Sequence, residues 1–183
     1  GLGSTGTVAA SGAGSVGLDI EVANAAAALV VDGDFEALSR GSLAAAGSGF
    51  GAKVTGALFR VNGDATIDTA RDATMAATSV IFVTGAFASQ SRSFTETGLL
   101  SAYDSIAIAA PQGISAEQLR TDGGTTTLLA ANGSITVANL TSFGDVTAQA
   151  RSIRISNGGR LNIASAQATA GDLFIHTGGS LTL

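Results

Sequence analysis

Short segments in which apolar and polar residues alternate recur along the last third of the chain. Examples are residues 133–138 (GSITVA), 151–156 (RSIRIS) and 171–176 (GDLFIH). Alternation with a period of two places every second side chain on the same face of an extended strand. Each segment therefore predicts a short strand with one buried face, and the glycine before several of these strands favours a turn there.

The spacing between these segments indicates a repeat. The strands predicted to begin at 152 and 172 are separated by the same interval as those beginning at 160 and 180. Upstream, two pairs of similar segments, which start at 33 and 41 and at 63 and 71, are separated by a longer interval. We interpret this as a repeat of about 20 residues carrying insertions, with a longer repeat in the first half as the alternative.

A repeat of this length favours one all-β architecture. It is too short for a propeller blade or a helical repeat, but it suits a β-solenoid, in which each strand pairs in parallel with its equivalent in the next coil. An antiparallel β-sandwich is the alternative, although it does not explain the regular recurrence. Residues 114–120 (ISAEQLR) fit either two helical turns, with Ser115 as N-cap, or an excursion at a turn. The residues predicted to point into the solenoid are the pairs Ile135/Val137, Val146/Ala148, Ile153/Ile155, Leu161/Ile163, Leu173/Ile175 and Leu181/Leu183.

The composition limits the classes of partner. The net charge of −5 provides no electrostatic drive toward nucleic acid, so no nucleic-acid partner is expected. The absence of cysteine excludes disulfides and thiolate metal sites. The longest apolar run, near residues 22–31, is too short to span a membrane.

Residues 133–183 resemble the filamentous haemagglutinin-type repeats of large bacterial exoproteins, which are passengers of two-partner secretion. The resemblance is strong over residues 133–183 and loose over residues 1–132, and it rests on the shape of the repeat. It implies a right-handed parallel β-helix, export through an outer-membrane secretion pore, and an extracellular or cell-surface location on a Gram-negative bacterium. The Asn-Pro-Asn-Gly signature of the family's secretion domain is absent. We therefore expect residues 1–183 to form a single solenoid segment, as a fragment of a longer rod.

The sequence carries little that points to catalysis. There is one histidine, His176, and no G-x-S-x-G motif, and the basic residues are scattered. The acidic residues Asp19, Glu21, Asp32, Asp34 and Glu36 fit either a calcium site or a solvated acidic edge, and EF-hand spacing is missing. We expect a non-catalytic structural or adhesive rod with no cofactor and no metal. A ligand-binding β-helix module is the alternative, followed by a carbohydrate-active β-helix enzyme.

Several surface residues are candidates for contact or modification. Asn132 and Asn139 begin N-x-[ST] sequons and are candidate glycosylation sites. Phe174 and His176 have the outward parity of their strand, and Phe82 lies in VIFV (80–83), which is apolar on both faces. Such a strand needs a cover, either an insertion such as residues 85–102 or a neighbouring molecule.

The partners expected from this pattern are other solenoid coils and an external target. Lateral or end-to-end self-association, or continuation of the same long chain, would cover the apolar surfaces. In the binding-module alternative, side loops at roughly 85–103 and 110–125 grip a glycan or a host protein.

Overall fold

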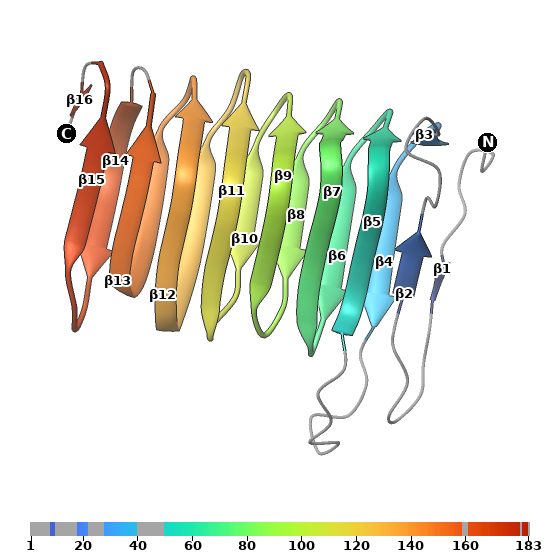
Figure 1. Cartoon of the computed structure of the whole chain (residues 1–183), viewed down its shortest axis with the longest axis horizontal. Helices are drawn as coiled ribbons and strands as arrows, with labels where there is room; N and C mark the ends of the chain where they lie inside the picture. Colours follow the sequence, from blue (N-terminus) through green and yellow to red (C-terminus); the bar gives the residue numbers. More distant parts are fainter. Residues whose placement is uncertain are drawn as a thin grey trace.

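The computed structural model describes residues 8–9, 18–21, 28–39, 50–158, 161–179 and 181–182. Within these residues every regular element is a β-strand, and Figure 1 shows the strands lying side by side along one axis. The strands are β1 (Val8–Ala9), β2 (Leu18–Glu21), β3 (Ala28–Val31), β4 (Phe35–Ser39), β5 (Phe50–Val61), β6 (Ala65–Thr69), β7 (Asp72–Val83), β8 (Phe87–Gln90), β9 (Phe94–Ala102), β10 (Ile106–Ala109), β11 (Gly113–Thr121), β12 (Thr126–Ser142), β13 (Val146–Asn157), β14 (Leu161–Ala168), β15 (Leu173–Thr177) and β16 (Leu181–Thr182).

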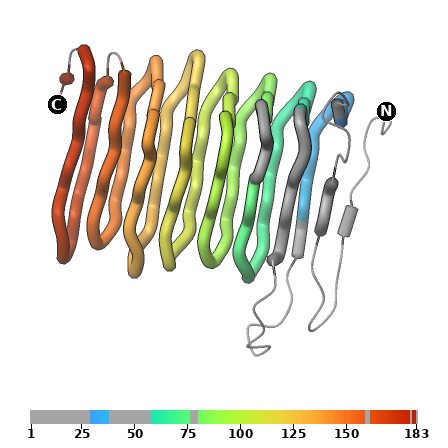
Figure 2. Tube along the Cα trace, in the orientation of Figure 1, coloured from blue at the N-terminus to red at the C-terminus, as the bar shows by residue number. Residues whose placement is uncertain are grey.

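Every ladder between the described strands is parallel, and the chain coils around one axis (Figure 2). Ile106 in β10 pairs with Phe87 of the preceding coil, in β8, and with Thr126 of the following coil, in β12. Successive turns of the stack are about 20 residues apart. The predicted β-solenoid with coils of this length is therefore confirmed, and the antiparallel sandwich is wrong.

The first coils are longer than the later ones. Ala37 in β4 pairs with Val8 in β1, and Phe35 pairs with Ala65 in β6. The step shortens after Ala65, which pairs with Phe87 in β8. The longer interval between similar segments in the first half of the sequence therefore corresponds to longer coils in the structure. Residues 40–49, which include the predicted segment 41–46, lie outside the described part.

Each later coil has three sides, which we name by their place in the chain. In the coil containing β12, the first side is residues 126–130, the second is 134–137 and the third is 139–142. The register shifts between Ala130 and Ser134, where the first side meets the second. A second shift, between Ala116 and Leu119 of the preceding coil, marks the bend from second side to third.

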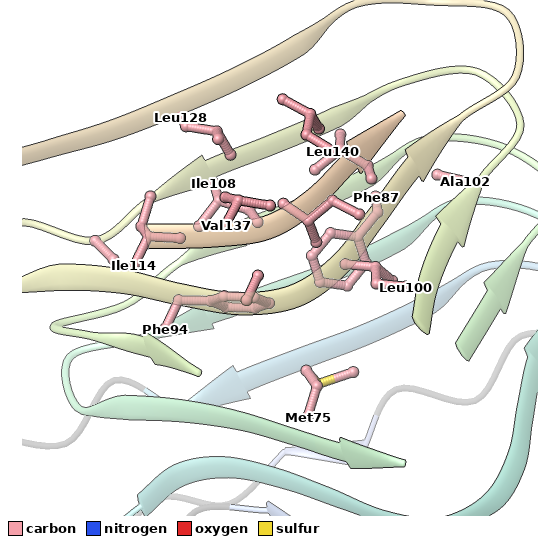
Figure 3. Close-up of a cluster of buried hydrophobic side chains, with 14 of the residues drawn as sticks. Met75, Phe87, Phe94, Leu100, Ala102, Ile108, Ile114, Leu128, Val137 and Leu140 are labelled. Atoms are coloured by element: carbon pink, nitrogen blue, oxygen red, sulfur yellow. The ribbon is translucent and has the colours of Figure 1, made fainter. Parts of the chain in front are cut away.

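The inward side chains of successive coils stack into one apolar core (Figure 3). Ile108, Leu128 and Ala148 occupy equivalent positions of three first sides, and each is at most 1% exposed. Small residues such as Ala130 and Ala150 lie fully buried at the corner between the first and second sides. The predicted inward residues from Ile135 to Ile163 are all buried. Burial of stacked apolar side chains is the main favourable term in folding.

The last described coil departs from this pattern. Leu173 and Leu181 have inward parity, yet they are 49% and 39% exposed, whereas Ile175 is half-buried against the core. The cause is their position, since β15 pairs only with β13 and β16 only with β14. Leu183 lies outside the described residues.

Three sequence expectations for the middle of the chain were wrong. Residues 114–120 form neither a helix nor a loop but most of strand β11. The bend at residues 117–118 separates the buried Ala116 and Leu119 by three positions, which imitates helical spacing. Residues 85–102 are not a covering insertion, because they contain β8 and β9, whose Phe87 and Phe94 lie in the core. The proposed gripping loops at 85–103 and 110–125 are accordingly coil strands and short turns.

Glycines occupy most of the turns that join a third side to the next first side, although residues 103–105 form this turn without one. The N–H of Gly85 donates to the carbonyl of Gly63 (2.9 Å), and the N–H of Asp104 donates to that of Gly85 (3.1 Å), so the turns stack backbone to backbone. A Cβ at Gly144 would overlap the carbonyl group of Gly124 in the preceding coil. Glycine is required there by close approach of the backbones.

We expect Gly144→Ala to lower the free energy of unfolding by about 2 kcal/mol, because the added methyl group forces two stacked turns apart. Gly158→Ala is the matched control, since a Cβ at Gly158 has no neighbour within 4 Å. It should change stability by no more than about 0.5 kcal/mol. Urea unfolding followed by circular dichroism measures both variants, and equal midpoints for the two would contradict the stacked-turn explanation.

Candidate functional site

The acidic residues near β4 hold the turns of neighbouring coils together. Oδ1 of Asp32 accepts a hydrogen bond from the side-chain amide of Asn62 (2.7 Å), and Oδ1 of Asp34 accepts one from the N–H of Asp64 (2.9 Å). Asp64 repeats the contact one coil later, accepting from the N–H of Ala86 (2.8 Å). These carboxylates therefore bridge coil to coil.

No calcium site forms from the acidic residues that the structure describes. Glu36 is exposed on the first side, away from a shared ligand set. Across the described ranges, no group of three or more His, Cys, Asp or Glu side chains is placed to hold a metal ion. The side chains of Asp19 and Glu21 lie outside the described part.

Glu96 is a buried carboxyl group that the sequence analysis missed. It is 1% exposed and occupies an inward position of β9, in register with Met75 of β7 and Ala116 of β11. Its Oε2 accepts hydrogen bonds from the backbone N–H groups of Glu117 (3.0 Å) and Gln118 (3.1 Å). Inward parity within FTETG was the signal that could have identified it.

The bend beside Glu96 explains why a carboxyl group lies in the core. The register shift at residues 116–119 takes the N–H groups of Glu117 and Gln118 out of the regular ladder, and Glu96 accepts from both. Gly98, at φ +119°, forms the corresponding bend one coil earlier, and its N–H donates to Oε2 of Glu117 (3.0 Å). Two glutamates thus fasten two stacked bends.

Burial raises the pKa of Glu96 to about 7, and the nearby Glu117 carboxylate adds to this effect, while the two backbone hydrogen bonds oppose it. Its Oε1 has no hydrogen-bond partner among the described residues. A protonated Glu96 therefore suits the interior better than an ionised one. Its position and partners assign it a structural role.

The predicted outward parity of Phe174 and His176 is observed on the second side of the last described coil. Phe174 is 42% exposed, and its ring lies nearly parallel to that of His176, at 11° with centroids 6.4 Å apart. The guanidinium of Arg154, which pairs with Phe174 in the ladder, lies 4.5 Å from the ring centroid. His176 is exposed and stacks on Phe174 as part of this surface.

Phe82 lies on a different side of the solenoid. It is half-buried on the third side, where the guanidinium of Arg60 lies 5.6 Å from its ring centroid. Leu58, Val80 and Leu99 are half-buried around it. Since β15 pairs with the second-side part of β13, Phe82 does not join Phe174 and His176 in one contact surface.

Both candidate glycosylation residues are exposed. Asn132 lies at the corner between first and second sides, where its N–H donates to the carbonyl of Pro111 (2.8 Å), and Asn139 lies on the outer face of the third side. In the first sequon, Ser134 accepts a hydrogen bond from the hydroxyl of Ser152 (2.7 Å). The two sequons therefore occupy different faces.

Two exposed aromatic residues were not foreseen. Tyr103 and Phe143 are 58% and 72% exposed, and they occupy equivalent positions in turns two coils apart. Asp122 takes that position in the coil between them and accepts a hydrogen bond from Nε of Arg120 (2.7 Å). The sequence signal for such an exposed turn residue is an aromatic residue that directly follows a predicted strand and precedes Asp or Gly.

Shallow hollows lie on the outer face of the second side. One of about 200 Å³ is lined by residues that include Thr136, Arg154 and Phe174, and an adjoining one of about 300 Å³ by residues that include Asn132 and Arg151. Ser134 and Ser152 line both. Together they place basic, acidic, hydroxyl and aromatic groups on one surface, because Asp172 also lines the first hollow.

Comparison of the chain with protein-family models, curated proteins and solved structures gives no match. Within the described ranges the structure contains no helix that could cross a membrane.

We expect Glu96→Gln to flatten the pH dependence of stability. The pKa of Glu96 is about 7 in the folded chain, above the value of 4.5 usual for glutamate. The stability it contributes is therefore complete below pH 4.5 and is lost as the pH rises through 7, by up to about 3 kcal/mol. The glutamine variant stays neutral, so its free energy of unfolding should fall less between pH 4.5 and pH 8.

Urea unfolding at a series of pH values measures this difference. Glu36→Gln is the control, since it neutralises an exposed glutamate on the first side. The control should keep the steeper fall of the unmodified chain. Identical pH profiles for the Glu96→Gln variant and the unmodified chain would contradict the assignment of the buried proton to Glu96.

Proposed function

We propose that this chain is a non-catalytic segment of a structural or adhesive rod, displayed outside a Gram-negative bacterial cell. The proposal combines the solenoid fold with the resemblance of residues 133–183 to the repeats of large two-partner-secretion exoproteins. An outer-membrane secretion pore is the export partner that this resemblance implies.

The observation that carries the proposal is the unbroken stack of coils. Parallel ladders connect β5 through β7, β9 and β11 to β12, and continue through β13 to β15. One apolar core runs from Val31 to Ile163 along the stack. Each coil adds about 4.8 Å along the axis, so repetition of this unit builds length rather than an enclosed cavity.

The proposed partners are further coils, supplied by the same long chain or by a second copy that packs laterally or end to end. The parallel ladders support this, because the backbone N–H and C=O groups of one coil pair with those of the next.

A ligand-binding module is the second candidate function, and one observation favours it. Arg154, Phe174 and His176 form a layered group on an exposed face, outside the core. Arginine and aromatic residues are enriched where proteins bind partners. This role is compatible with a rod, because an adhesin needs both length and contact surface.

Immunogold labelling of intact producing cells, combined with electron cryo-microscopy of the released material, tests the proposed function. We expect label on cells that have not been permeabilised, and elongated particles with an axial repeat of about 4.8 Å. An antibody against a periplasmic protein controls for leakage. Label that requires permeabilisation, or compact particles with a closed cleft, would contradict the extracellular rod.

A further inference from the structure

Asparagine is directly followed by glycine at three places in the chain, each where a strand ends or bends. The pairs are Asn62-Gly63, Asn132-Gly133 and Asn157-Gly158. An asparagine side chain can react with the backbone nitrogen of the next residue, and glycine favours this reaction because it has no Cβ to hinder the approach. The reaction also needs a side-chain amide that is free to turn toward that nitrogen. The structure meets this requirement differently at the three pairs.

The side chains of two of these asparagines are held in place. Oδ1 of Asn62 accepts a hydrogen bond from Nε of Arg60 (2.7 Å), and its side-chain amide donates to Oδ1 of Asp32 (2.7 Å). Asn157 is 4% exposed, and its side-chain amide donates to the carbonyl of Leu140. Either side chain must break these hydrogen bonds before it can react.

The side chain of Asn132 is exposed, and it forms no hydrogen bond with any residue in the described ranges. Residues 131–133 lie outside the ladder registers with β10, β11 and β13, because the first side bends into the second side there. Ser134 pairs with Gly113 of the preceding coil and with Ser152 of the following coil. The exposure of Asn132 therefore belongs to a corner in the middle of the stack.

We propose that Asn132 is a site of spontaneous deamidation, with water as the only co-reactant. The backbone nitrogen of Gly133 attacks Cγ of Asn132 and forms a C–N bond. The bond between Cγ and Nδ2 breaks, and the proton of the Gly133 N–H leaves with the side-chain nitrogen as ammonia. Water then opens the cyclic imide at either of its carbonyl carbons, which gives aspartate or isoaspartate. This inference does not depend on the proposed function.

Either product changes the corner at which Asn132 lies. Aspartate adds a negative charge beside Arg151, which lines the same hollow. Isoaspartate routes the backbone through Cβ and Cγ and so lengthens it. The corner has no room for this, since even a Cβ at Gly133 would overlap the carbonyl group of Gln112 in the preceding coil. Both products also remove the first N-x-[ST] sequon.

The test follows the conversion of amide to carboxyl at each site by mass spectrometry of tryptic digests. Trypsin places the three pairs in separate peptides, residues 61–71, 121–151 and 155–160. The folded 183-residue chain is incubated in mildly alkaline buffer and sampled over time. Asn132 should convert at least about tenfold faster than Asn62 or Asn157, whose side chains must first break hydrogen bonds.

The same incubation in urea separates the effect of the fold from that of the local sequence. In the unfolded chain the three rates should agree within about threefold, because glycine follows each asparagine. Asn139 is an internal control, since it is exposed and lies in the same tryptic peptide as Asn132 but precedes Leu140. It should stay unmodified in both incubations.

Two variants serve as matched controls. Asp32→Ala removes the acceptor that holds the side-chain amide of Asn62, so it should speed conversion at Asn62 severalfold and leave the rate at Asn132 unchanged. Asn132→Gln removes the reactive side chain and should abolish conversion in the peptide of residues 121–151. Circular dichroism melts show whether each variant keeps the fold of the unmodified chain.

Faster conversion at Asn132 in the folded chain, together with similar rates at the three pairs in urea, supports the proposal. Equal rates in the folded chain, or faster conversion at Asn62 or Asn157, would overturn it. The same order of rates in urea would also overturn it, because the local sequence would then set the order. Continued conversion of residues 121–151 in the Asn132→Gln variant would place the reaction at another residue.

Discussion

The hydrogen bonds that join each coil to the next are the interaction on which the rest of this structure depends. Because the ladders are parallel and nearly in register, a residue in the later coils contacts its equivalents one coil away in both directions. Equivalent residues of successive coils therefore stack along the axis. Inward apolar residues stack into the core, the glycines at the turns lie above one another, and outward residues form rows on the outer faces.

Local departures from this repetition each have a compensating group. The bend at residues 117–118 takes two N–H groups out of the ladder, and buried Glu96 accepts from both. Where turns approach closely, as at Gly144, the side chain is absent. The outer faces carry no such constraint, so charge and aromatic residues gather there without cost to the core.

Much of the fold could be predicted from the sequence, because apolar and polar residues alternate in most strands. Pairs such as Ile153/Ile155 therefore identify the buried face directly. The contact of Arg154 with Phe174 also follows, since a single repeat separates them. The strand at 113–121 could not be recognised from the sequence. Its bend places the buried residues Ala116 and Leu119 three positions apart, whereas a regular strand buries every second residue. The sequence also could not show that Phe82 and Phe174 lie on different sides of the solenoid. The corners between sides have no consistent sequence signal, so the side on which a residue lies could not be predicted. Glu96 was overlooked since an inward carboxyl group depends on backbone donors that only the bend provides.

Disulfide trapping tests the in-register parallel stack most directly, because the chain has no cysteine of its own. Thr127 and Thr147 pair across β12 and β13 on the first side, and their Cα atoms should lie about 4.8 Å apart, within the range that a disulfide spans. Cysteines at these two positions should cross-link on mild oxidation, while cysteines at Thr127 and Thr141, which lies on the third side, should not. A folded 127/147 variant that fails to cross-link, or equal cross-linking of both pairs, would contradict the stack.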